Sequence, residues 1–366
     1  MEFRKGGSEY IRRLIGFGIQ NGTRRANIIG EWEIESAVRI PEDFTLILDN
    51  CHLKMADNTF DNMFINEHHD ISEGDAPACV DRHIAIIGRG KAILDGGTYN
   101  GLSEKNSLKE GMPSISKNHL LFFTNVDGFE IRNISFYNMR YWAVNLTFCC
   151  NGEVTDLHFK ADDTCIDPNG NVYHGLSMEN YSHMVVKQAD GVDIRRGCHH
   201  ILIENITGFA GDDLVALTAI NSKINQKYAL DGWSDDICYI KVKNVVGEAL
   251  SSNVRLLCQS INGFPRSSLH HILVDGIDDI SATTEHLKNH GMYGVHINTN
   301  HLYGDSLATE EEMHHITVRN VRSRADYAVG LAGNPVKSLT LENIVAFDGA
   351  GYIADLRGQE LGTGPW

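Results

Sequence analysis

One short frame recurs along the chain and constrains its fold more than any other feature. Apolar and polar residues alternate over five or six positions, and the frame ends in Asn followed by Ile or Val. It occurs as FEIRNI (129–134), HILIENI (200–206), YIKVKNV (239–245), HITVRNV (315–321) and LTLENI (339–344), with a Gly variant at HILVDGI (271–277). A period of two indicates β-strands rather than helices.

The spacing of the frame predicts the architecture. Its corner residues are Asn133, Asn205, Asn244, Gly276, Asn320 and Asn343. The last two are 23 residues apart, and the first two are 72 apart, about three such units. A unit of this length is too short for a strand, a helix and two loops, but it can hold one rung of three short strands. We therefore expect an all-β chain, a single-stranded right-handed parallel β-helix whose corner Asn residues form a ladder.

A second strand follows seven to nine residues after most of these corners. Stacked in register, its apolar residues are predicted to point inward: Val192, Val215, Val254, Val295 and Val329. Because side chains alternate along a strand, the residues that follow them must point outward. The predicted outward column is Asp193, Ala216, Arg255, His296 and Gly330, with rungs about 4.8 Å apart.

Residues 1–366 are expected to form one domain. Amphipathic spacing in 8–28 predicts a helix, so we assign residues 1–30 to an N-terminal cap that covers the end rung. Rungs are assigned to residues 45–357. Inserted loops are expected near 55–80, 96–118, 161–180, 221–236 and 281–312.

Composition excludes some partners. The net charge of −16 gives no electrostatic footprint for nucleic acid or for an anionic membrane surface. No segment resembles a signal peptide, and no apolar run approaches the roughly 18 residues of a membrane span. Eight cysteines without a CxxC pair suit free thiols. We expect a cytoplasmic protein without a cofactor or metal; its oligomeric state stays open.

Acidic residues open the second strand of two consecutive rungs, ADGVDI (189–194) and AGDDLVAL (210–217). Asp190 and Asp213 occupy equivalent positions 23 residues apart, and Asp212 precedes Asp213 at the turn. Like charges this close raise at least one pKa, which can yield a general acid and a general base near neutral pH. Cleavage of a glycosidic bond needs both groups.

Other roles for these acids stay open at this point. Asp-Gly and Gly-Asp-Asp are ordinary turn sequences, and clustered acids can bind calcium. A second acidic segment, ADDTCIDPNGN (161–171), places Asp163, Asp167, Asn169 and Asn171 loosely as in a calcium loop. It lacks the closing glutamate of that loop, so a turn is favoured.

The stretch from about 129 to 275 resembles glycoside hydrolase family 28, the polygalacturonase-like enzymes. The family motifs N-T-D-G-x-D and G-D-D-C-x-A-I are matched by QADGVDI (188–194) and GDDLVAL (211–217), after ISFYNMRYWAVNL (134–146). The resemblance implies a pectin-lyase-like solenoid and an O-glycosyl hydrolase that acts with inversion. It implies that Asp212 is the general acid and that Asp190 and Asp213 activate water.

Three departures from the family pattern bear on specificity. Gln188 and Ala189 replace the Asn and Thr before the first aspartate. No G-H-G follows, and Ser252 falls where its histidine would stack, so one rung could be missing. Arg255 is followed by two leucines where the family has R-I-K. The family's Arg and Lys hold the sugar carboxylate, so the lost lysine weakens the expectation of galacturonate.

Five residues are substrate-binding candidates: Asp193, Arg195, Arg255, Tyr293 and His296. Asp193 is expected to orient sugar hydroxyls or Arg255, and Arg195 could replace the missing lysine. Tyr293 and His296 lie further along the predicted groove. Trp142 and Trp233 could stack on a sugar face, although buried anchors are commoner.

The pairs His199/His200, His270/His271 and His314/His315 open the Asn-bearing strands, where a stacked corner is favoured over a metal site.

The leading hypothesis is a hydrolase that removes terminal sugars from oligosaccharides, galacturonate-containing or related plant or microbial glycans. A uronate lyase or epimerase is an alternative, although such enzymes need a cation to stabilise an enolate, and Lys and Arg are few around the aspartates. A non-catalytic carbohydrate-binding β-helix is a third possibility. The missing histidine and lysine favour it, and the clustered acids oppose it.

Overall fold

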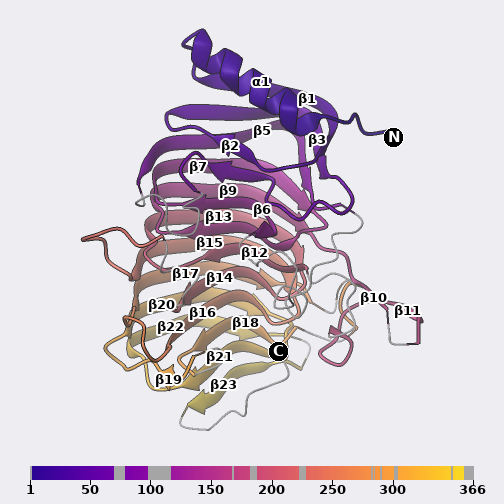
Figure 1. The fold of residues 1–366 in the computed structure, drawn as a ribbon. Helices are drawn as coiled ribbons and strands as arrows, with labels where there is room; N and C mark the ends of the chain where they lie inside the picture. The colour runs from indigo at the N-terminus through magenta and orange to yellow at the C-terminus, as the bar shows by residue number, and fades with distance from the viewer. Residues whose placement is uncertain are drawn as a thin grey trace.

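The chain winds into stacked rungs (Figure 1). The computed structural model describes residues 2–69, 79–97, 117–166, 169–181, 188–221, 228–281, 283, 285–288, 291–300, 304–347 and 349–357. Sheet A contains β1 (Arg25–Ile34), β3 (Phe44–Met55), β5 (Asp81–Asp95), β7 (Val126–Tyr137), β9 (Cys150–Lys160), β13 (His199–Ala210), β15 (Ile237–Ala249), β17 (Leu269–Asp279), β20 (Met313–Ser323) and β22 (Lys337–Ala346).

Sheet B is built from the shorter strands between them. It contains β2 (Val38–Ile40), β4 (Phe64–Asn66), β6 (His119–Thr124), β8 (Tyr141–Thr147), β12 (Gln188–Ile194), β14 (Asp213–Ala219), β16 (Ser252–Ser260), β18 (Tyr293–Asn298), β21 (Tyr327–Gly333) and β23 (Gly351–Arg357), with β19 (Ser306–Leu307) paired to β16. Within each sheet these rung strands pair in parallel with the strand of the next rung. The predicted right-handed parallel β-helix is confirmed.

The core is a stack of apolar columns between the sheets. Each of the five valines predicted to point inward is fully buried: Val192, Val215, Val254, Val295 and Val329. The next inward column is Ile194, Leu217, Leu256, Ile297 and Leu331, of which even Leu331 is only 4% exposed. Because one rung covers the apolar face of the next, the stack stabilises itself through nearest neighbours.

The predicted Asn ladder lies in sheet A, where each strand bends. All six corner residues have positive φ, from 50° at Asn343 to 80° at Gly276, a region that Asn and Gly adopt more readily than other residues. Asn343 Nδ2 donates to Asn320 Oδ1 at 2.8 Å, and Asn244 Nδ2 donates to Asn205 Oδ1 at 3.3 Å. Gly276 has no side-chain amide, so Asn320 Nδ2 donates to Asp275 Oδ1 instead, at 2.7 Å.

The N-terminal end differs from expectation in its boundary. The predicted capping helix is present as α1 (Gly7–Gln20), with Ile11 and Ile15 buried. A Cβ on Gly18 would lie 2.4 Å from the Arg25 carbonyl oxygen, so glycine lets the helix lie directly on the first rung. That rung begins with β1 at Arg25, not near residue 45, because β1 pairs with β3 in the same sheet.

Two expected loops contain rung strands. Strand β4 lies inside 55–80, and β18 lies inside 281–312 together with β19. The segment 161–180 includes an antiparallel hairpin of β10 (Thr164–Ile166) and β11 (Val172–His174). Most of 96–118 and part of 221–236 lie outside the described residues. Among the residues that the structure describes, no helix has the length and apolar character to cross a membrane.

The corner geometry predicts a difference between two substitutions at Asn320, whose φ is 56°. Both Asn320→Gly and Asn320→Ala remove its amide hydrogen bonds, but only alanine places a Cβ in the left-handed region, at a cost of about 1–2 kcal/mol. The alanine variant is expected to be less stable than the glycine variant by about that amount in urea unfolding. Equal midpoints for the two variants would contradict the proposed role of the corner.

Candidate functional site

The outward column predicted for sheet B is confirmed residue by residue. Asp193 pairs with Ala216, Ala216 with Arg255, Arg255 with His296, and His296 with Gly330. Strand β14 pairs directly with β16, so these two strands belong to successive rungs, with no described strand of sheet B between them. Ser252 lies next to Asp213 in this register, at the position expected from sequence.

The three aspartates of the predicted catalytic cluster lie together. Val192 pairs with Val215, which sets Asp190 beside Asp213 on neighbouring rungs. One carboxylate oxygen from each of Asp190, Asp212 and Asp213 lies within 4.8 Å of the other two. The Asp213 backbone N–H donates to Asp190 Oδ1 at 3.1 Å.

A glycine allows this close approach. A Cβ on Gly191, which follows Asp190, would lie 2.5 Å from the Leu214 carbonyl oxygen. A larger residue there would push strands β12 and β14 apart, and with them the two carboxylates. The Asp-Gly sequence therefore has a packing role in addition to any role in chemistry.

The three carboxylates differ in exposure. The Asp213 residue is fully buried and Asp190 is 7% exposed, whereas Asp212 is partly exposed at the turn before β14. Tyr181 Oη donates to Asp212 Oδ2 at 3.4 Å. Asp212 is thus the member of the cluster that a ligand can reach from solvent.

Asp213 is held by neighbours on the next rung. Arg255 Nη1 donates to Asp213 Oδ2 at 3.0 Å, and Ser252 Oγ donates to Asp213 Oδ1. Both carboxylate oxygens of Asp213 are therefore occupied by donors from the next rung. Ser252 therefore supplies a hydrogen bond at the place where the family pattern led us to look for a histidine.

Asp193 lies beside a second arginine. Arg195 Nη1 donates to Asp193 Oδ1 at 3.3 Å, and its guanidinium lies 4.6 Å from the centre of the Trp142 ring. Trp142 pairs with Asp190 across the β8–β12 junction. The Arg195–Trp142 contact therefore lies next to the aspartate cluster, on the side of the preceding rung.

Burial has the largest effect on the pKa of the inner acids. Burial, followed by repulsion from Asp193, Asp213 and Asp212, raises the pKa of Asp190 well above its ordinary value. Burial also raises the pKa of Asp193, which Arg195 partly opposes. The interaction with Asp193 is thus one of the causes that raise the pKa of Asp190, after burial.

Tyr293 and His296 form a wall rather than an open subsite. Their rings stack with centroids 4.3 Å apart, and both residues are 8% exposed. Burial and the nearby Arg255 lower the pKa of His296 to about 3, so its ring is neutral at physiological pH. These two residues lie in the predicted groove, but a sugar would contact only their edges.

The aspartate cluster fits calcium poorly. Calcium takes six to eight oxygen ligands, and the three converging carboxylates lie against the guanidinium of Arg255, which opposes a second cation. The second acidic segment, residues 161–171, fits calcium no better. Asp163 faces His174 at 3.6 Å and His286 at 3.2 Å, and Asp167 lies outside the described residues.

Tyr181 was not predicted as a site residue from the sequence. It lies in a segment without the repeat frame, and only the folded structure brings it next to Asp212. The contact of Arg255 with Asp213, one rung away, was not predicted either. Both contacts depend on side-chain reach across rungs, for which the repeat gives no signal. Trp233, the other tryptophan considered, lies 6.5 Å from His199 between ring centroids, away from the cluster.

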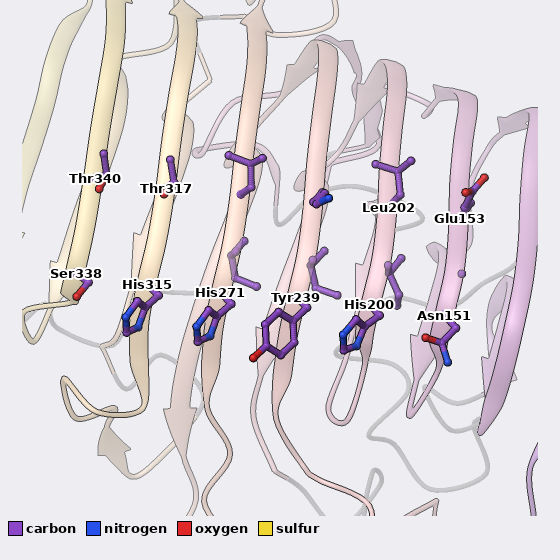
Figure 2. A pocket seen from close by; sticks show the side chains of 16 residues that line it. Asn151, Glu153, His200, Leu202, Tyr239, His271, His315, Thr317, Ser338 and Thr340 are labelled. Atoms are coloured by element: carbon purple, nitrogen blue, oxygen red, sulfur yellow. The ribbon is translucent and has the colours of Figure 1, made fainter.

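A hollow lies on sheet A, away from the aspartates. It encloses about 790 Å³ over strands β9, β13, β15, β17, β20 and β22. Figure 2 shows its lower edge as a row of side chains from successive strands: Asn151, His200, Tyr239, His271, His315 and Ser338. The second histidine of each predicted pair lies in this row, so the pairs do form stacked corners.

Comparison with solved structures supports the pectin-lyase-like β-helix fold. A mutant tailspike protein of E. coli bacteriophage HK620 in complex with a pentasaccharide matches with a TM-score of 0.57 at 12% identity, over 96% of this chain and 61% of that one. A double mutant of that tailspike gives 0.59 at 11% identity, with the same coverage. An exopolygalacturonase from Thermotoga maritima gives 0.50 at 13% identity, over 95% of this chain and 87% of the enzyme.

This chain thus spans less than two thirds of the tailspike chains. At identities this low, the structural similarity shows a shared fold alone. No protein-family model matches the sequence, and the search of curated proteins finds no match.

The raised pKa of Asp190 predicts a pH-dependent stability difference. As pH rises above about 4, the ordinary Asp value, the unfolded chain loses this proton before the folded chain does, which favours unfolding by up to ~1.4 kcal/mol per pH unit. Asp190→Asn keeps the shape and removes the proton. The variant is expected to gain stability over the wild type as pH rises from 4 to 8.

Urea unfolding at several pH values measures this difference, and exposed Asp231→Asn serves as the control that should follow the wild type. A stability difference between Asp190→Asn and the wild type that stays constant with pH would show that Asp190 titrates normally.

Proposed function

We propose that this protein is a glycoside hydrolase in which Asp212 protonates the leaving oxygen while Asp190 and Asp213 position and activate water. The observation that carries the proposal is the convergence of three carboxylates in unequal environments. One is partly exposed, one is buried against an arginine, and one is buried with a raised pKa. Such inequality lets one residue type supply both acid and base.

The resemblance to glycoside hydrolase family 28 supports these roles, since the aspartates match the family motifs in sequence and come together in space. The solved structures of similar fold also support the proposal. Several of the tailspike mutants are in complex with a penta- or hexasaccharide, and another neighbour is an exopolygalacturonase. We infer an oligosaccharide substrate and, following that enzyme and the expected loops, cleavage from a chain end.

Burial bears on the stereochemistry. In most glycosidases, carboxyls about 5–5.5 Å apart retain configuration and those 6.5–9.5 Å apart invert it. The oxygens here lie within 4.8 Å, at the retaining end of that scale. However, Asp213 is fully buried and hydrogen-bonded on both oxygens, so it cannot approach a sugar carbon as a nucleophile would. We therefore propose inversion.

The charges around the cluster favour a neutral sugar over galacturonate. Arg255 contacts Asp213, and Arg195 contacts Asp193, so each predicted cation is already balanced by a carboxylate. Asp190 and Asp212 add two more acids without adding a cation. Among the residues that the structure describes here, four aspartates face two arginines, so a sugar carboxylate would meet repulsion, and the same excess of acid disfavours a lyase or epimerase.

The proposed role of Asp212 predicts a specific kinetic defect. Asp212→Asn removes the proton donor and little volume, so kcat is expected to fall by about 100- to 10,000-fold while oligosaccharide binding is kept. Reducing-end release from a panel of neutral and acidic oligosaccharides measures turnover, and calorimetry measures binding. The matched control is the exposed Asp231→Asn, which should behave as the wild type.

An active Asp212→Asn enzyme would contradict the role assignment. A wild-type protein that binds oligosaccharides without releasing reducing ends would instead identify a non-catalytic binding protein. Products with the ultraviolet absorbance of a conjugated enol acid would identify a lyase. Proton NMR of the first product decides the stereochemistry, with the inverted anomer expected.

A further inference from the structure

Histidine rings stack in two adjacent columns on sheet A. In the first column, His199 pairs with Cys238, Cys238 with His270, and His270 with His314. The second column stacks His200 on Tyr239, Tyr239 on His271 and His271 on His315, with centroids 4.7–4.8 Å apart. Figure 2 shows the second column edge-on along the hollow of sheet A.

At rungs β17 and β20 the columns bring four imidazoles together. His270 Nδ1 lies 2.7 Å from His271 Nδ1, and His314 Nδ1 lies 2.7 Å from His315 Nδ1. The rings of His270 and His314 stack almost in parallel, 4.8 Å apart. Ligand nitrogens of His270, His271 and His314 lie within 4.8 Å of one another.

A carboxylate orients one of these rings. His270 Nε2 faces Asp236 Oδ2 at 3.8 Å. Asp236 is itself fixed, because its oxygens accept hydrogen bonds from Ser268 N at 2.8 Å and from Ser234 Oγ at 2.9 Å. A histidine that turns one ring nitrogen to a carboxylate presents the other as a metal ligand, and metal-binding histidines commonly have such a partner.

We propose that His270, His271, His314 and His315 bind one divalent transition metal, with copper or nickel preferred over zinc. Imidazole donors without oxygen ligands suit these metals rather than calcium or magnesium. At metal–nitrogen distances of 2.0–2.1 Å, ligands at a right angle lie about 2.9 Å apart and tetrahedral ligands about 3.3 Å apart. In each pair the two Nδ1 atoms are hydrogen-bonded at 2.7 Å, so they need to separate less for the right angle of square or octahedral coordination than for a tetrahedral one.

The two histidine pairs must move closer together to bind one ion, and their position at the surface allows this movement. His271 and His315 are exposed, so their side-chain torsions can rotate without disturbing the core. The site lies on sheet A, whereas the aspartate cluster lies on sheet B. Metal binding is therefore an activity separate from the proposed hydrolysis, and neither depends on the other.

The chain contains a matched control for this site. His199 Nδ1 and His200 Nδ1 lie 2.9 Å apart in the same corner geometry, with φ of 55° at both His200 and His271. The next rung carries Cys238 and Tyr239 in place of a histidine pair, so only two imidazoles meet there. Asn tolerates this left-handed conformation, which makes His271→Asn and His200→Asn comparable substitutions.

Calorimetric titration of tag-free protein with CuCl₂, NiCl₂ and ZnCl₂ tests the proposal, with EPR of the copper form to report coordination. One Cu²⁺ or Ni²⁺ ion per chain is expected, with tetragonal Cu²⁺ coupled to more than two nitrogens. His271→Asn is expected to weaken binding by more than about tenfold, and His200→Asn to leave it unchanged.

Three results would overturn the proposal. No binding to the wild type would show that the pairs are structural corners only. Equal affinities for wild type, His271→Asn and His200→Asn would show adventitious surface binding. Zinc bound as tightly as nickel would contradict the inferred coordination angle. Thermal unfolding without metal shows whether the two variants remain folded.

Discussion

Parallel hydrogen-bonded register between successive rungs is the constraint on which the rest of the structure depends. It sets Val192 against Val215, and so it sets Asp190 against Asp213. A slip by one residue would exchange the inward and outward faces of every strand that shifted. The buried valine column opposes such a slip, because it would put Asp193 or Arg255 into the core in place of valine. Stability and site geometry thus have the same origin.

The register also explains the electrostatics of the site. Stacking places acidic residues from neighbouring rungs in contact, where they are shielded from water and repel each other. Arg255 and Ser252 on the following rung donate hydrogen bonds to Asp213, while burial and the neighbouring acids raise the pKa of Asp190. Three aspartates on two neighbouring rungs thereby acquire different partners and different exposure.

Much of this could be predicted from sequence because the repeat is regular. The inward valines, the outward column from Asp193 to Gly330 and the Asn corners follow from a period of two within a repeat of about 23 residues. The start of the first rung could not be predicted, since β1 (Arg25–Ile34) lacks the Asn frame. Contacts of long side chains, such as Arg255 to Asp213, depend on rotamers that the repeat does not encode.

A crystal structure of the Asp212→Asn variant soaked with an oligosaccharide that the wild type cleaves tests the central claim most directly. We predict that the scissile oxygen lies within hydrogen-bonding distance of the residue 212 side chain and that a water molecule is held beside Asp190 and Asp213. A sugar bound on sheet A would contradict the proposed site. So would a structure in which the strands that carry Asp190 and Asp213 do not pair with each other.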